Sequence, residues 1–162
     1  AEQGNMQVIT TASLALQRRV FEEMGGFSTG YTHYGFEDRD LTQRLLNADC
    51  DIRFCADVVA NHENDDTLGA LCKKLNVSAQ HSAPLFMKQH PQVYAAMSYA
   101  RVDARLHPAL RGLNWLGAPL LPALIAIGDR GVHWPLPYRL KKFYVQGVMA
   151  LAYLQGSAHQ GG

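Results

Sequence analysis

Glu37 and Asp38 are the residues whose type and position best suit chemistry. They lie side by side within residues 22–40, which read EEMGGFSTGYTHYGFEDRD. A carboxylate held rigidly at the start of a helix can accept a proton from a reacting hydroxyl group. The simpler interpretation is that Glu37, Asp38 and Asp40 only form the acidic first turn that many helices have.

A helix and a glycine turn must come before this pair. Leu16, Val20 and Met24 recur at a spacing of four residues, which predicts a helix over residues 13–24. Gly25 suits the left-handed position that ends a helix, and Gly26 prolongs the break before a polar loop. We accept that the two glycines serve backbone geometry first.

A second helix must carry the pair itself. The pattern predicts that it begins near Phe36, with Leu41 and Leu45 facing inward. Acidic residues in its first turn suit the positive end of the helix dipole. Asp40 and Arg44 form an i,i+4 pair, which in isolated helices contributes only about 0.2–0.5 kcal/mol.

Short β segments and further helices are expected around these elements. Residues 6–11, 51–55 and 57–61 are rich in β-formers and predict short strands. From Thr67 onward the pattern is helical, with breaks near Pro84 and Pro91. Further helices are predicted over residues 93–106 and 143–154. We therefore expect an α+β fold that is mostly helical.

Composition limits the classes of function. The chain has 162 residues, of which 48% are hydrophobic, so it can bury a core. Residues 1–66 hold 12 acidic and 5 basic side chains, whereas residues 101–162 hold 7 basic and 2 acidic ones. The basic residues are sparse and lack interleaved aromatics, so no nucleic-acid partner is expected. Three cysteines without a CxxC pair favour a reduced, intracellular protein.

An uncharged run over residues 112–128 has three interpretations. It can be a buried helix pair, a segment lying at a bilayer interface, or a surface for a protein partner. Trp115 and the flanking Arg and Lys residues suit an interfacial anchor. A run of 17 residues containing Pro119 and Pro122 is predicted to be too short and too broken to span a membrane.

Residues 13–62 resemble the C-terminal part of the catalytic domain of family 2 glycosyltransferases, nucleotide-sugar enzymes with the GT-A fold. The resemblance rests on an arginine, a GGF turn, a YGFED element, a DL..RL helix and a histidine, in that order over about 50 residues. The matching residues are Arg18, Val20, Phe21, Gly25, Gly26, Phe27, Tyr34, Gly35, Phe36, Glu37, Asp38, Asp40, Leu41, Arg44, Leu45 and His62. Ser28 replaces the acid that usually follows GGF.

The resemblance implies roles for these residues. Asp38 would be the general base of an inverting sugar transfer, and Glu37 would orient the acceptor. His62 would be a ligand of Mn²⁺ or Mg²⁺, although a lone histidine is equally well a structural residue. Arg18 would contact phosphate or support the second helix. The acceptor would be lined by Gly26, Phe27, Tyr34, Gly35 and Phe36, with core packing an equal alternative for Phe36.

The resemblance also implies an arrangement in two parts. Residues 1–66 would be the C-terminal, acceptor-side portion of a GT-A-like domain with a few short strands, and residues 67–162 a helical extension. Two DxD strings occur, at residues 38–40 and 49–51, but neither follows a hydrophobic strand as a metal-binding DxD would. We therefore expect the nucleotide-binding half to be absent from these 162 residues and the chain alone to be inactive.

The sequence thus predicts part of a nucleotide-sugar-dependent glycosyltransferase. The intact enzyme would transfer a hexose to a carbohydrate or lipid-linked hydroxyl acceptor. It would be cytoplasmic or peripheral at the inner face of the membrane, with a membrane surface as a further candidate partner. The rival hypothesis is a non-enzymatic module, derived from a glycosyltransferase, whose helices bind a membrane or a protein. A small metal-dependent hydrolase using His62 is a third, weaker idea.

Overall fold

The described part of the protein is helical. A computed structural model describes residues 13–53, 55–59, 61, 67–131 and 135–159. Its α-helices are α1 Arg18–Glu23, α2 Glu37–Asn47, α3 Leu68–Val77, α4 Ala83–Gln89, α5 Pro91–Ala96, α6 Leu110–Gly117, α7 Leu121–Gly131 and α8 Tyr138–Ala158. A π-helix, η3 (Ser78–Ser82), joins α3 to α4, and two 3₁₀-helices are η4 (Ser98–Val102) and η5 (Ala118–Leu120).

The expectation of an α+β fold with a GT-A-like, strand-containing portion is wrong for the residues that the structure describes. Residues 51–53 and 55–59 run without strand pairing, and Val58 and Val59 are 69% and 84% exposed. A lone extended segment has neither a neighbour for its backbone hydrogen bonds nor a face to bury, so β propensity alone does not make it a strand. The strand predicted at residues 6–11 lies outside the described residues.

The first helix is shorter than its pattern predicts. α1 spans only Arg18–Glu23, buries none of its side chains, and has no side-chain cap at Gln17. A short helix with no fully buried side chain has little to extend it toward residue 13. Its end follows the prediction: Gly25 and Gly26 have φ of +77° and +67°, and the Gly26 amide donates to the Phe21 carbonyl.

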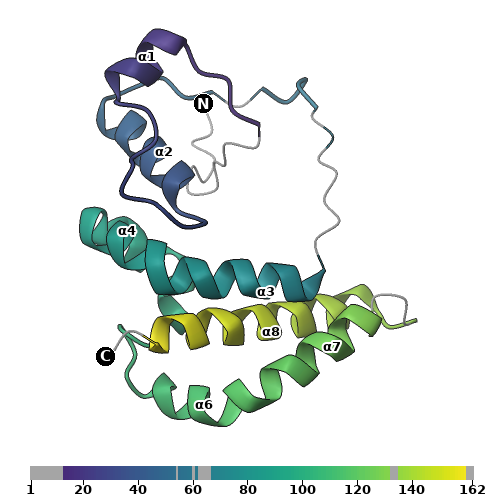
Figure 1. The fold of residues 1–162 in the computed structure, drawn as a ribbon. Coiled ribbons are helices and arrows are strands. Elements are labelled where there is room, and N and C mark those ends of the chain that lie inside the picture. Colours follow the sequence, from purple (N-terminus) through teal and green to yellow (C-terminus); the bar gives the residue numbers. More distant parts are fainter. Residues whose placement is uncertain (1–12, 54, 60, 62–66, 132–134, 160–162) are drawn as a thin grey trace.

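The helices from α3 onward pack into a bundle around α8. α3 lies along α8, α6 and α7 also contact α8, and α7 contacts α3 as well (Figure 1). One core cluster joins α4, α5 and α8 around Phe86, Tyr94 and Tyr153. A second cluster joins α3, α7 and α8 around Cys72, Leu121 and Val148. The α1–α2 pair lies on the far side of α3 from α6 and α7 (Figure 1).

The helix predicted over residues 93–106 is broken. α5 ends at Ala96, a 3₁₀ turn follows, and Asp103 has an extended backbone. Asp103 is fully buried and accepts hydrogen bonds from both Arg105 (Nε, 2.8 Å) and the hydroxyl of Tyr94. The Tyr94 hydroxyl also contacts that of Tyr153, 2.7 Å away in α8. This tertiary network, which helix periodicity does not reveal, overrides the local preference.

The uncharged run is a continuous helical segment, contrary to its expected interruption. Helical structure extends over 22 residues, Leu110–Gly131, as α6, η5 and α7. Pro119 and Pro122 each occupy the first turn of a helical piece, where the missing amide breaks no hydrogen bond. By length and composition this is one helix that could cross a membrane. The interpretation as a buried helix pair is also wrong, because Trp115 is 78% exposed.

Candidate functional site

The start of α2 presents Glu37 and Asp38 as predicted. Phe36 stands before the helix in a left-handed conformation (φ 72°), and its ring packs on Phe86 and Tyr94 in the core. Burial of this ring fixes the direction in which α2 leaves the loop. The two carboxylates that follow are half-buried, at the positive end of the helix dipole, which favours negative charge there.

The two carboxylates have unfilled hydrogen-bonding capacity. Asp38 Oδ1 accepts from the Arg39 amide at 2.7 Å. Glu37 Oε2 is buried, with no hydrogen-bond partner among the described residues. A buried carboxylate oxygen without a donor is costly. A hydrogen-bond donor that reached this oxygen would relieve that cost.

Asp40 has a structural role within the same helical turn. Its carboxylate is 2% exposed and accepts from Arg44 Nε at 2.9 Å, while its other oxygen lies 2.9 Å from His90 Nε2 in the α4–α5 junction. Arg44 also donates to the carbonyl oxygens of Met24 and Gly26. One buried network therefore joins the glycine turn, α2 and the helical bundle.

Tyr31 completes the surroundings of this acidic turn. Its hydroxyl donates to Gln89 Oε1 at 2.6 Å. Burial, followed by the negative charges of Asp40 and Glu37, raises the pKa of Tyr31 well above its usual range, with Arg44 opposing. Tyr31 therefore stays a neutral hydrogen-bond donor throughout the physiological range.

The loop before α2 is held against the π-helix. Gly35 has φ +94°, and a Cβ there would lie 2.5 Å from Ser78 Oγ. Ser82 Oγ lies 3.2 Å and 3.1 Å from the carbonyl oxygens of His33 and Tyr34. Glycine at position 35 thus allows both the left-handed backbone and the close approach to η3.

Of the other predicted substrate-binding side chains, Phe27, Tyr34 and Arg18 are exposed and Phe36 is buried. Phe27 and Tyr34 are accessible: Phe27 packs edge-on against Phe21, and the Lys74 ammonium lies 5.6 Å from the Tyr34 ring centre. Phe36 is 4% exposed, so its ring supports the site from the core. Arg18 lies on the surface of α1, paired with Glu22 at 2.7 Å.

The described residues do not assemble a metal site. No group of three His, Cys, Asp or Glu side chains among them is placed to hold a metal ion. Asp40, in the first DxD string, is occupied by Arg44 and His90. His62 and the acids at 63, 65 and 66 lie outside the described residues.

Sequence reasoning missed the partners that hold the site in place. His90 and Ser82 are 50 and 48 residues from Asp40 and Tyr34, the residues that they contact. No local pattern connects residues at that separation. The one available signal was an acidic residue, Asp40, on the apolar side of an otherwise amphipathic helix, since such a residue needs a buried partner.

Comparison with known proteins supports a glycosyltransferase relationship for this site. Residues 4–63 match a family model described as the N-terminal domain of galactosyltransferase. The match includes Glu37 and Asp38, and it does not single out family 2. No curated protein matches the chain, and no solved structure does.

Proposed function

We propose that the start of α2 is the acceptor-side part of an inverting, nucleotide-sugar-dependent glycosyltransferase of the family 2 type. The observation that carries the proposal is the half-buried carboxylate pair at a helix start, with Glu37 Oε2 lacking a donor. It lies inside the segment that matches the galactosyltransferase model. The donor would be a nucleotide diphosphate sugar and the acceptor a carbohydrate or lipid-linked hydroxyl.

Asp38 acts as general base in this proposal. It takes the proton of the acceptor hydroxyl while that oxygen attacks the anomeric carbon, and the bond from this carbon to the diphosphate oxygen breaks. Glu37 accepts a hydrogen bond from a neighbouring hydroxyl and so orients the acceptor. Ser82 holds the carbonyl oxygens of His33 and Tyr34, just before the pair in the chain, and so restrains the loop that leads into the site.

Transfer assays test these two roles. The assay uses UDP-galactose and a panel of hydroxyl acceptors with the natural protein that contains residues 1–162. Asp38→Asn should lower kcat by a factor of about 10²–10⁴, whereas Glu37→Gln should mainly raise KM for the acceptor. Asp49→Asn, at an exposed position with φ 53°, is the matched control because asparagine also tolerates that conformation. Full activity of Asp38→Asn would exclude it as the base.

Two finer parts of the proposal have separate tests. Residues 1–162 alone should transfer little sugar, because neither DxD string follows a hydrophobic strand; rapid turnover by the chain would contradict this.

We also propose that His62 helps to bind Mn²⁺ or Mg²⁺. Calorimetric titration with Mn²⁺, with and without UDP, should show heat that is lost in His62→Ala. Equal binding by this variant would make His62 a structural residue.

A further inference from the structure

An exposed apolar surface lies on α6, α7 and α8. Along Leu110–Gly131, exposed side chains recur at spacings of three, four and seven residues, which places them on one side of the helix. A second exposed set lies at the start of α8. Together we name them the apolar face: Leu113, Leu116, Leu120, Ile127, Leu140 and Phe143.

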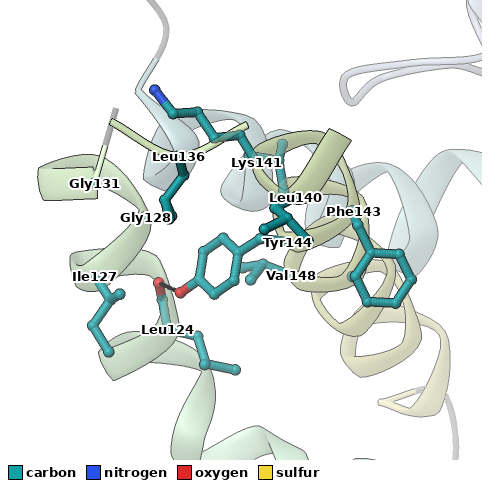
Figure 2. A pocket seen from close by; sticks show the side chains of 12 residues that line it. Leu124, Ile127, Gly128, Gly131, Leu136, Leu140, Lys141, Phe143, Tyr144 and Val148 are labelled. Carbon is teal, nitrogen blue, oxygen red and sulfur yellow. Dashed lines mark hydrogen bonds between the residues drawn. The ribbon is translucent and has the colours of Figure 1, made fainter. Parts of the chain in front are cut away.

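A groove joins the two sets. It lies between α7 and α8, has a volume of about 560 Å³ and is lined by apolar side chains that include Leu124, Ile127, Leu140 and Phe143. Figure 2 shows Tyr144 inside it, with its hydroxyl donating to the Leu124 carbonyl. The Tyr144 hydroxyl is therefore already hydrogen-bonded within the protein. An apolar ligand in the groove would meet almost no unpaired polar group.

The charged residues in this part of the chain are almost all basic. Between residues 107 and 159 the chain has five basic residues, Arg111, Arg130, Arg139, Lys141 and Lys142, and one acidic residue, Asp129. Asp129 is directed inward, where Oδ1 accepts from the Leu68 amide at 2.6 Å. These five basic residues, which we call the basic rim, therefore attract an anionic surface. A second copy of the chain would bring its own cations against these, which opposes a symmetric dimer through this face.

The same helix packs against protein on its other side, which decides how it meets a bilayer. Leu121, Leu124 and Ile125 contact the core of α3 and α8, and Gly128 allows Leu68 and Tyr144 to approach closely. Although its length suffices for a span, a spanning orientation would draw α3, with Lys73 and Lys74, into lipid at high cost. The helix is therefore suited to lie along the surface.

We propose that the apolar face docks on an anionic phospholipid membrane, with α6–α7 lying in the interface and an acyl chain filling the α7–α8 groove. The exposed apolar side chains enter the boundary between headgroups and acyl chains, and the basic rim contacts lipid phosphates. Trp115, 78% exposed on the same helix, suits the headgroup level. This inference goes beyond sugar transfer and does not depend on it.

Vesicle flotation of residues 1–162 tests the proposal. The chain should float with vesicles of mixed phosphatidylglycerol and phosphatidylcholine, and bind pure phosphatidylcholine less. Leu120→Asp and Phe143→Asp should each lower the partition coefficient at least about tenfold, since each removes a large apolar side chain and adds a charge. The control Val59→Asp changes an apolar residue that is at least as exposed but lies outside the face, and it should have no effect. Circular dichroism checks that the variants are folded.

Charge and depth give two independent readouts. Arg139→Glu with Lys142→Glu should abolish the preference for anionic vesicles, and added salt should weaken wild-type binding. In a Trp134→Phe background Trp115 is the only tryptophan left. Its fluorescence should be quenched most by lipids brominated near the headgroup.

Three results would overturn the proposal. They are absence of binding to anionic vesicles at low salt, strongest quenching by lipids brominated at the chain ends, and a stable dimer in solution that Phe143→Asp dissociates.

Discussion

At the scale of single residues, Asp40 shows what sequence spacing can and cannot predict. The sequence predicted an i,i+4 pair with Arg44, of the kind that contributes little on a surface. In the structure Asp40 is buried and also contacts His90. The same ion pair therefore connects α2 to the helical bundle. Periodicity could predict the pair and the helix, but not burial, because burial depends on a residue 50 positions away.

Asp40→Asn should therefore destabilise the protein strongly. The substitution leaves Arg44 largely buried without a negative partner, and breaking a buried ion pair costs about 3 kcal/mol or more. Urea unfolding followed by circular dichroism measures the change. Asp51→Asn is the control, because Asp51 and Arg53 form a solvent-exposed pair whose loss should change nothing measurable. Equal midpoints for the two variants would show that the network has no stabilising role.

At the scale of elements, the Asp103 network explains why helix patterns failed between α5 and α6. Asp103 follows η4 and has an extended backbone. It binds Arg105, which also donates to the Ala79 carbonyl of η3. It also binds Tyr94, whose hydroxyl contacts Tyr153 of α8. Helix propensity, worth tenths of a kcal/mol per residue, cannot compete with a buried charge that must be paired. In contrast, α2 and α8 follow their apolar periodicity closely because packing and propensity agree there.

This network predicts how stability depends on pH. Burial acts to raise the pKa of Asp103, but hydrogen bonds from Arg105 and Tyr94 prevail and hold that pKa below its usual value. A lowered folded-state pKa contributes stability that is fully present above the unfolded value, about 3.9, and is lost as pH falls below it. Thermal unfolding should therefore show a fall in Tm below about pH 4.

Asp103→Asn separates this contribution from other carboxylates. The variant should have a lower Tm at neutral pH, because Arg105 is then buried without its partner, and a shallower fall below pH 4. Asp51→Asn again serves as the exposed control. An unchanged acid limb in Asp103→Asn would assign the acid sensitivity to other groups.

At the scale of the whole molecule, the two proposed sites lie on opposite sides of the helical bundle. Helix α2, which carries the carboxylates, lies on one side of α3, whereas α6 and α7 lie on the other side (Figure 1). A chain bound to a membrane through α6–α7 would thus direct its candidate transfer site away from the lipid. The sequence predicted both regions as separate segments, but not the loop contacts that join them, since Gly35 and Ser78 are paired by tertiary packing alone.

Gly35→Ala should test whether this contact couples the two parts. The alanine would have a left-handed backbone and a Cβ 2.5 Å from Ser78 Oγ, whereas Gly25→Ala has the same kind of backbone strain with nothing within 4 Å. The difference between the two variants therefore isolates the contact, and we expect about 1–3 kcal/mol from overpacking. Hydrogen exchange should show α2 losing protection before α8 in Gly35→Ala only. Adding Ser78→Ala should restore part of it, and equal exchange in both glycine variants would mean that the α1–α2 pair is held by other contacts.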